Sequence, residues 1–122
     1  MNSDSNTTIQ ILRTLLREFR DERDWEKFHD PKNLAEAVSI EAAELLELFL
    51  WKSPDDVERS IKDPEFKHSV EEELADILCF SLSLANVADI DVSCAVVKKI
   101  ETNRLKYPVD KSRGTATKYD RL

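Results

Sequence analysis

The stretch IEAAELLELFLWKSPDDVERSIKDPEFKHSVEEELAD, residues 40–76, contains two acidic pairs with the same spacing. Glu41 and Glu44 form the first pair, and Glu73 and Asp76 form the second. On a helix, residues three apart lie on one face, one turn from each other. Both pairs fall in segments that otherwise read as buried helix, where carboxylates are costly unless a cation or a partner group holds them. The stretch therefore predicts two core helices arranged around a charged ligand.

The rest of the chain predicts an all-α fold, a four-helix bundle with one additional short helix. One Gly and four Pro in 122 residues leave little turn chemistry for a many-stranded β fold. Asp30-Pro31 and Ser53-Pro54 each combine a capping side chain with a proline in the first turn, which is typical of a helix start. The apolar periodicity then predicts helices over these ranges: 7–24, 31–51, 54–62, 65–87 and 92–106.

The length predicts a single domain over residues 1–122. Residues 1–6 and 109–122 are polar and are expected to be flexible or subunit-crossing tails. The helix over 31–51 is apolar on nearly every face from Leu34 onward, which is typical of a helix shared with another subunit. We therefore expect a homo-oligomer, either a dimer or a tetramer.

Charge and composition exclude several classes of protein. A net charge of −7 argues against a protein that wraps duplex nucleic acid. No apolar run approaches 18 residues and no leader opens the chain, so we expect no membrane segment. Cys79 and Cys94 lie in apolar helical stretches and read as buried free thiols in a reducing compartment, so we expect a cytoplasmic protein.

The charge is divided between an acidic body and a basic end. Residues 98–122 carry a net charge of +5, and residues 1–97 carry −12. Such a division suits a protein that handles a metal ion together with a phosphorylated ligand. A solvated basic tail without function is the alternative.

The four acids converge if their two helices pack antiparallel through the acidic faces. Four close carboxylates repel and raise one another's pKa, and a divalent cation removes that repulsion. An all-carboxylate set suits a hard ion, Mg²⁺ or Mn²⁺, and Mg²⁺ usually leaves coordination positions to water and substrate phosphates. The pattern thus indicates phosphate-ester or phosphoanhydride chemistry. Ordinary solvated surface acids are the alternative.

A di-iron bundle is a competing interpretation of the same composition. Glu26-x-x-His29 and Glu65-x-x-His68 match the E-x-x-H motif that such bundles use twice. The spacing opposes it, because Glu65/His68 and Glu73/Asp76 would share one helix about 12 Å apart along its axis.

Aromatic and basic side chains flank the acids along the chain. Trp25, His29 and Trp51 lie on either side of the helix that carries Glu41 and Glu44, and aromatic faces can stack a nucleobase. Tryptophans that only fill the ends of a bundle are the alternative. Lys99 and Asn103 are spaced i,i+4 on the last helix and could hold an anionic ligand, or could belong to an exposed polar face.

Several of these segments together resemble a known family. The runs Glu41-Ala-Ala-Glu44-Leu-Leu-Glu-Leu-Phe-Leu-Trp51 and Glu72-Glu-Leu-Ala-Asp76 are similar to the MazG-like superfamily of all-α nucleoside triphosphate pyrophosphohydrolases. The segments around Trp25–Asn33 and Lys99–Pro108, with Ser112-Arg-Gly114, resemble its dCTP pyrophosphatase branch. The resemblance covers roughly residues 9–120.

The resemblance implies hydrolysis between the α- and β-phosphates of a nucleoside triphosphate, giving a monophosphate and pyrophosphate. It implies Mg²⁺ as cofactor, with Glu41, Glu44, Glu73 and Asp76 as metal ligands and catalytic residues. The implied substrate contacts are these: Trp25, His29, Trp51, Phe80, Lys99 and Asn103. The family also implies dimers or tetramers whose active sites can draw on a neighbouring subunit.

The chain departs from the family pattern at two positions. Ile40 stands where many MazG proteins carry a second glutamate, and Phe80 stands where we expect tyrosine in the dCTP branch, so a phenolic hydroxyl is absent. The primary hypothesis is a Mg²⁺-dependent hydrolase of dCTP-like nucleotides that serves nucleotide-pool cleaning. A non-enzymatic helical module for oligomerisation or nucleotide sensing, which retains the fold, is the alternative.

Overall fold

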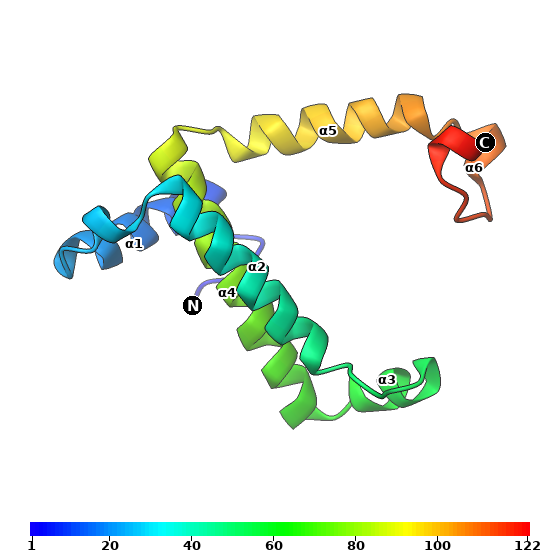
Figure 1. The fold of residues 1–122 in the computed structure, drawn as a ribbon, viewed down its shortest axis with the longest axis horizontal. Helices are drawn as coiled ribbons and strands as arrows, with labels where there is room; N and C mark the ends of the chain where they lie inside the picture. The colour runs from blue at the N-terminus through cyan, green and yellow to red at the C-terminus, as the bar shows by residue number, and fades with distance from the viewer. The chain divides into compact units, whose positions relative to one another are not determined.

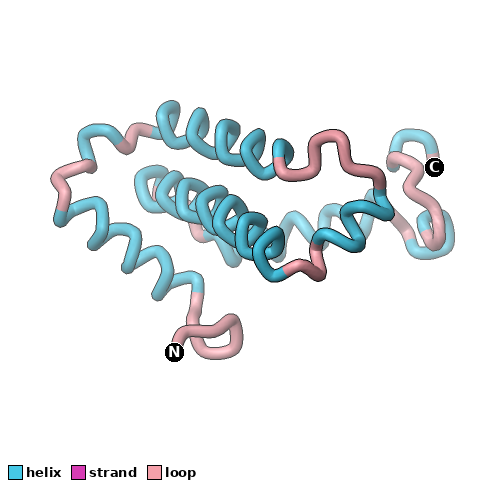
Figure 2. The backbone as a smooth tube through the Cα atoms, turned by 90° about the horizontal axis from the view of Figure 1, so that it is seen from below, coloured by secondary structure: helices cyan, strands magenta, loops and turns pink.

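The computed structural model describes all of residues 1–122 and is built from helices and loops without a strand (Figures 1 and 2). The all-α prediction is confirmed. The chain divides into two compact units, residues 1–89 and residues 90–122. Each unit is described by itself below. No single helix is both long enough and apolar enough to cross a bilayer.

The first unit opens with α1 (Ile9–Glu22), whose first turn is capped by Thr8, the hydroxyl of which accepts a hydrogen bond from the Ile11 amide. The chain then turns at Asp24, which has a φ of +53°, and enters the short 3₁₀ helix η1 (Glu26–Phe28). The Asn33 side chain donates to the Phe28 carbonyl at 3.2 Å and to the Asp30 carboxylate at 2.8 Å. This side chain fixes the end of η1 to the start of the next helix.

The next helix, α2 (Pro31–Glu47), begins where the sequence predicts, since the Asp30 carboxylate accepts from the Asn33 amide and Pro31 lies in the first turn. It ends four residues before the predicted end. The amides of Leu48, Phe49 and Leu50 bond to the carbonyls three residues earlier, which tightens the last turn, and Trp51 then adopts a φ of +62°. The short helix α3 (Pro54–Ser60) follows, with the capping box that Ser53 and Asp56 predict.

The long helix α4 (Pro64–Ala88) completes the first unit and ends at Asp89 in the left-handed conformation. It runs antiparallel to α2, with which it makes the main packing contact, and α1 packs on α4 as well (Figure 1). The buried apolar side chains are Leu34, Leu82 and Ala85, so the small core lies where the start of α2 meets the C-terminal half of α4.

Polar side chains fasten α1 to α4 at this core. The Asn86 side-chain amide donates to the Arg13 carbonyl at 3.1 Å, and the Arg13 Nε donates back to the Asn86 Oδ1 at 2.9 Å. A second Arg13 nitrogen donates to the Ala85 carbonyl at 3.2 Å. These bonds hold α1 across the face of α4 that carries the candidate site.

The second unit consists of α5 (Val92–Lys106), α6 (Val109–Ser112) and the 3₁₀ helix η2 (Tyr119–Arg121). The Asp91 carboxylate accepts from the Cys94 amide at 2.8 Å and caps α5, as predicted. Tyr107 and Tyr119 pack edge to face with centroids 6.0 Å apart, and the Lys106 ammonium lies 4.7 Å from the centre of the Tyr119 ring. The polar segment 109–122 therefore contains local helices that the sequence pattern does not predict. The closed four-helix bundle and the single-domain assignment stay predictions.

Candidate metal and nucleotide site

The antiparallel pairing of α2 and α4 brings the predicted acids together. Glu41 of α2 and Glu73 and Asp76 of α4 each place a carboxylate oxygen within 4.8 Å of the others. Glu41 and Glu73 are half-buried between the helices, and Asp76 is more exposed. Glu44 lies one turn along α2 from Glu41 and within hydrogen-bonding reach of it. The i,i+3 spacing therefore does place both pairs at one junction.

The electrostatics of this junction are unfavourable without a cation. Burial, the hydrogen bond with Glu44 and the nearby charges of Glu44 and Asp76 together raise the pKa of Glu41 to about 7 from an ordinary 4.5. Burial and the charge of Glu44 also raise the pKa of Glu73. Crowded carboxylates thus hold protons at a pH where isolated ones would be ionised.

The same residues fit a hard divalent cation. The Oε2 atoms of Glu41 and Glu73 are buried and have no hydrogen-bond partner. The three converging side chains all offer carboxylate oxygen, the ligand atom that Mg²⁺ and Mn²⁺ prefer. A cation there would supply the partner that the two orphaned oxygens lack.

The E-x-x-H motifs do not form a metal centre of this kind. No histidine belongs to the converging group, which contains only carboxylates. His68 instead lies at the exposed start of α4, where its ring nitrogens face Glu71 at 3.9 Å and Glu72 at 3.4 Å. His29 caps the end of η1, away from any second E-x-x-H pair. The structure therefore gives the di-iron interpretation no support.

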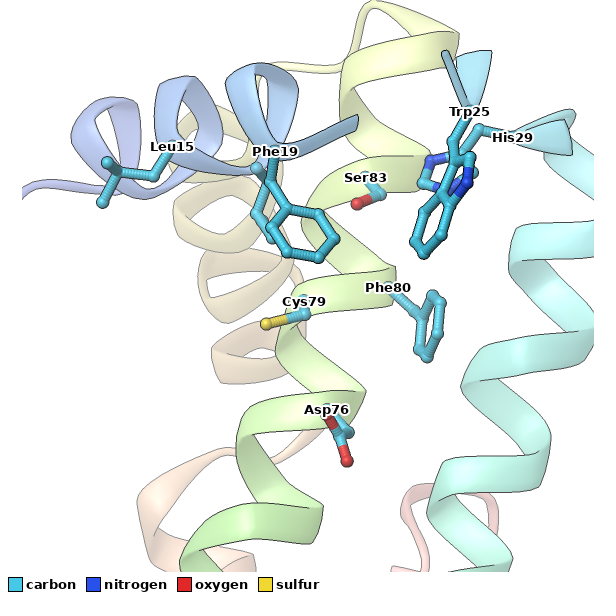
Figure 3. Close-up of a pocket in the computed structure, with 9 residues that line it drawn as sticks. Leu15, Phe19, Trp25, His29, Asp76, Cys79, Phe80 and Ser83 are labelled. Carbon is cyan, nitrogen blue, oxygen red and sulfur yellow. The ribbon is translucent and has the colours of Figure 1, made fainter. Parts of the chain in front are cut away.

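A pocket of about 420 Å³ lies beside the acids, walled by α1, η1 with its flanking residues, and α4 (Figure 3). Asp76 belongs both to the carboxylate group and to the wall of this pocket. The predicted base contacts Trp25, His29 and Phe80 all line it. Its full lining is Leu15, Leu16, Phe19, Trp25, His29, Asp76, Cys79, Phe80 and Ser83.

The aromatic wall of the pocket is held in place by local contacts. Trp25 packs edge to face on Phe19 with centroids 5.8 Å apart, and its amide donates to the Arg20 carbonyl at 3.0 Å. Burial and the charge of Arg20 lower the pKa of His29, which favours the neutral imidazole at neutral pH. Figure 3 shows the Trp25 and Phe80 rings on the same side of α4, with Asp76 one turn below Phe80.

The remaining predicted contacts are not among the residues that line the pocket. Trp51 is 93% exposed at the turn after α2 and does not line the pocket. Lys99 and Asn103 lie on α5 in the second unit. Their roles as substrate contacts stay predictions. The pattern analysis missed Phe19, Cys79 and Ser83 as pocket residues because each falls within an apolar helical stretch that reads as core.

Comparison with known proteins agrees with this geometry. Residues 37–122, more than half of the chain, match the MazG-like family. The chain belongs to this family. The MazG-like match begins four residues before Glu41 and so includes all four acids, the pocket residues of α4 and the whole second unit.

Individual relatives show which members of the MazG-like family the chain is similar to. The chain is 44% identical over 115 residues to dCTP pyrophosphatase 1 of Rattus norvegicus, covering 94% of this chain and 68% of that protein. It is 43% identical over 118 residues to dCTP pyrophosphatase 1 of Bos taurus, covering 97% and 70%. A crystal structure of a pyrophosphatase from Archaeoglobus fulgidus shares 48% identity and a TM-score of 0.77, covering 82% of this chain and 92% of that one. The predicted resemblance to the dCTP pyrophosphatase branch is confirmed.

Proposed function

We propose that this chain is a Mg²⁺-dependent pyrophosphohydrolase that converts dCTP-like nucleoside triphosphates to the monophosphate and pyrophosphate. The observation that carries the proposal is the position of Asp76, which lies in both the carboxylate group and the wall of the aromatic pocket. A base held in the pocket would direct its phosphates toward the carboxylates. The similarity to dCTP pyrophosphatases from several mammals supports a pyrimidine triphosphate as substrate.

Glu41, Glu73 and Asp76 would hold the metal, with Glu44 completing the set. A bound Mg²⁺ would neutralise triphosphate charge and make a water molecule more acidic. The carboxylates that hold it would have to be ionised, so Glu41 must release the proton that its crowded position otherwise retains.

Glu44 is suited to accept a proton from the attacking water. It lies beside Glu41 but is more exposed than Glu41 or Glu73, and it is not one of the three carboxylates that converge most closely. A carboxylate at the edge of the set can accept a proton from water while Glu41, Glu73 and Asp76 keep the metal. We therefore assign Glu44 the role of candidate general base.

Trp25 and Phe80 would orient the base, and the shape of the pocket would exclude water from around it. Aromatic stacking contributes ~1–3 kcal/mol per base and tolerates different bases. Because Phe80 has no hydroxyl, it can add stacking or packing but no hydrogen bond to a substrate.

The apolar surface of α2 supports assembly into a homodimer or homotetramer. Ile40 is 58% exposed and Leu46 is 70% exposed, and Leu50 at the end of the helix is exposed as well. A single chain rarely leaves several large aliphatic side chains of one short segment uncovered. A second copy of the chain would cover them.

The test is product identification with a matched variant. The wild-type protein, incubated with dCTP and Mg²⁺, should give equal amounts of dCMP and pyrophosphate. Asp76→Asn keeps the size of the side chain and should retain helicity by circular dichroism while turnover falls by at least ~10²-fold, the scale of losing one electrostatic contributor. Full activity in this variant, or orthophosphate as the only inorganic product, would contradict the proposal.

A further inference from the structure

The hydroxyl group of Ser83 lies on the pocket wall and has no hydrogen-bond partner within the protein. Ser83 lies on α4, is 8% exposed and lines the pocket beside Phe19 and Trp25 (Figure 3). Its hydroxyl makes no hydrogen bond in the structure. Ser81, two residues earlier on the same helix, donates to the Ile77 carbonyl at 2.7 Å, and Ser69 donates to the Glu65 carbonyl at 3.3 Å. Ser83 therefore differs from its neighbours on α4.

Such an arrangement needs an explanation, because a serine inside a helix normally bonds to the carbonyl four residues before it. A hydroxyl that faces a pocket and has no partner within the protein is free to bond water or a ligand. No other side chain that lines the pocket carries a hydroxyl or an amide group, and Phe19, Phe80 and Leu16 are apolar. A polar atom of a ligand in the pocket would find this hydroxyl available.

A second polar side chain of the pocket also has an atom without a partner. The Nδ1 atom of His29 is buried and has no hydrogen-bond partner. His29 follows η1, whereas Ser83 belongs to α4, so the two side chains line the pocket from different walls. The apolar rings of Phe19 and Phe80 would contact the faces and edge of a planar ligand but could not pair its polar atoms. Two unpaired polar atoms among apolar walls indicate a ligand that is planar, largely apolar and polar along one edge.

We propose that Ser83 is a specificity-determining residue that hydrogen-bonds the polar edge of the nucleobase, with His29 as the second contact. This inference rests on the proposed function, because it takes the pocket to be the base site of a nucleotide hydrolase. A hydroxyl both donates and accepts, and a neutral imidazole offers one donor and one acceptor. Ser83 therefore suits a base edge that presents a ring nitrogen next to an exocyclic amino or carbonyl group. It also places a hydroxyl on the α4 wall one turn beyond Phe80, which has none.

The test compares Ser83→Ala with Ser81→Ala in the full-length protein. The ligands are dCMP, which carries a base, and pyrophosphate, which carries none, each measured as an inhibitor of dCTP hydrolysis. Losing one neutral hydrogen bond should weaken dCMP inhibition of Ser83→Ala between about 2-fold and about 10-fold. Pyrophosphate inhibition should stay at the wild-type value, and KM for dCTP should rise while kcat is retained. Ser81→Ala should leave both inhibitors unchanged, because its hydroxyl bonds to its own helix.

Thermal unfolding gives a second readout. If the Ser83 hydroxyl stabilised the fold, its removal would lower the melting temperature. Alanine favours a helix over serine, and the Ser83 hydroxyl makes no hydrogen bond that the substitution would remove, so Ser83→Ala should melt at a temperature equal to or above wild type. A lower melting temperature, unchanged dCMP inhibition, or equal weakening of dCMP and pyrophosphate would each overturn the inference.

The proposed function can fail separately. If the wild-type protein hydrolyses no nucleotide, calorimetric titration with dCMP and pyrophosphate replaces the inhibition assay and judges Ser83 by the same comparison. Absence of dCMP binding to the wild-type protein would then overturn the inference as well.

Discussion

Competition between a proton and the metal at Glu41 gives a quantitative prediction. With a pKa of about 7, Glu41 in the metal-free protein is about 90% protonated at pH 6 and about 10% protonated at pH 8. Because a metal ligand must be deprotonated, binding of Mg²⁺ should release about 0.9 proton at pH 6 and about 0.1 proton at pH 8. The apparent affinity for Mg²⁺ should accordingly fall about 10-fold from pH 8 to pH 6.

The assay is isothermal titration of Mg²⁺ into metal-free protein at both pH values, in two buffers of different ionisation enthalpy, which yields the number of protons released. Glu41→Gln is the matched variant, since it retains the side-chain shape but cannot release a proton. Its affinity should be weaker and its proton release smaller than that of the wild-type protein at pH 6. Equal affinity and equal proton release at pH 6 and pH 8 in the wild-type protein would refute the reasoning.

The same proton affects stability in a defined direction. The folded protein keeps the Glu41 proton up to about pH 7, whereas an unfolded chain releases it near 4.5. The folded state therefore binds more protons between these values, and the free energy of unfolding of the metal-free protein should decline as the pH rises from about 4.5 to about 7. Mg²⁺ should restore stability most at pH 8, and Glu41→Gln should flatten the decline.

Three further predictions concern the pocket, the core and the surface. Trp25→Ala should weaken dCMP binding in calorimetric titration by about 5-fold to about 150-fold, which is the contribution of one stacked base. Phe28→Ala, outside the pocket, should change the affinity by less than about 2-fold. Equal effects of the two substitutions would argue against stacking on Trp25. Asn86→Ala removes both bonds to Arg13 and should lower the free energy of unfolding in urea by about 1–3 kcal/mol, and an unchanged midpoint would contradict the fastening of α1. Leu46→Glu should reduce the sedimentation coefficient if α2 is an interface; an unchanged assembly would exclude this face.

The spacing of the acids predicted that they converge if their two helices pack antiparallel. Each pair shares one helix face: Glu41 with Glu44 on α2, and Glu73 with Asp76 on α4. The antiparallel pairing of α2 and α4 then brings the two faces together. The capping signals at Asp30, Ser53 and Asp91 also fixed helix starts, because a side chain that accepts a backbone amide leaves a local mark in the sequence.

The end of α2 could not be read in the same way. The apolar periodicity continues through Leu48, Phe49 and Leu50. No glycine or proline marks the point where the amides begin to bond to the carbonyl three residues earlier instead of four. The positive φ of Trp51 is unusual for a bulky residue, and nothing local predicts it.

The pocket required the tertiary structure. Ser83 and Phe19 occupy positions that a helical pattern assigns to the core, and residue type does not distinguish a side chain that lines a pocket from one that packs. Their exposure to the pocket depends on η1 folding across α4, which is set by Asp24, Asn33 and the packing of Trp25 on Phe19. Those contacts join residues from separate elements, so periodicity within one element cannot reveal them.

Hydrolysis of dCTP in ¹⁸O-labelled water tests the central claim most directly, since it reports which phosphorus is attacked. The proposed pyrophosphohydrolase activity, supported by the similarity to dCTP pyrophosphatases, predicts attack at the α-phosphorus with water as the nucleophile. Mass spectrometry should then find one ¹⁸O atom in dCMP and none in pyrophosphate. Label in pyrophosphate, or release of labelled orthophosphate without dCMP, would contradict the account.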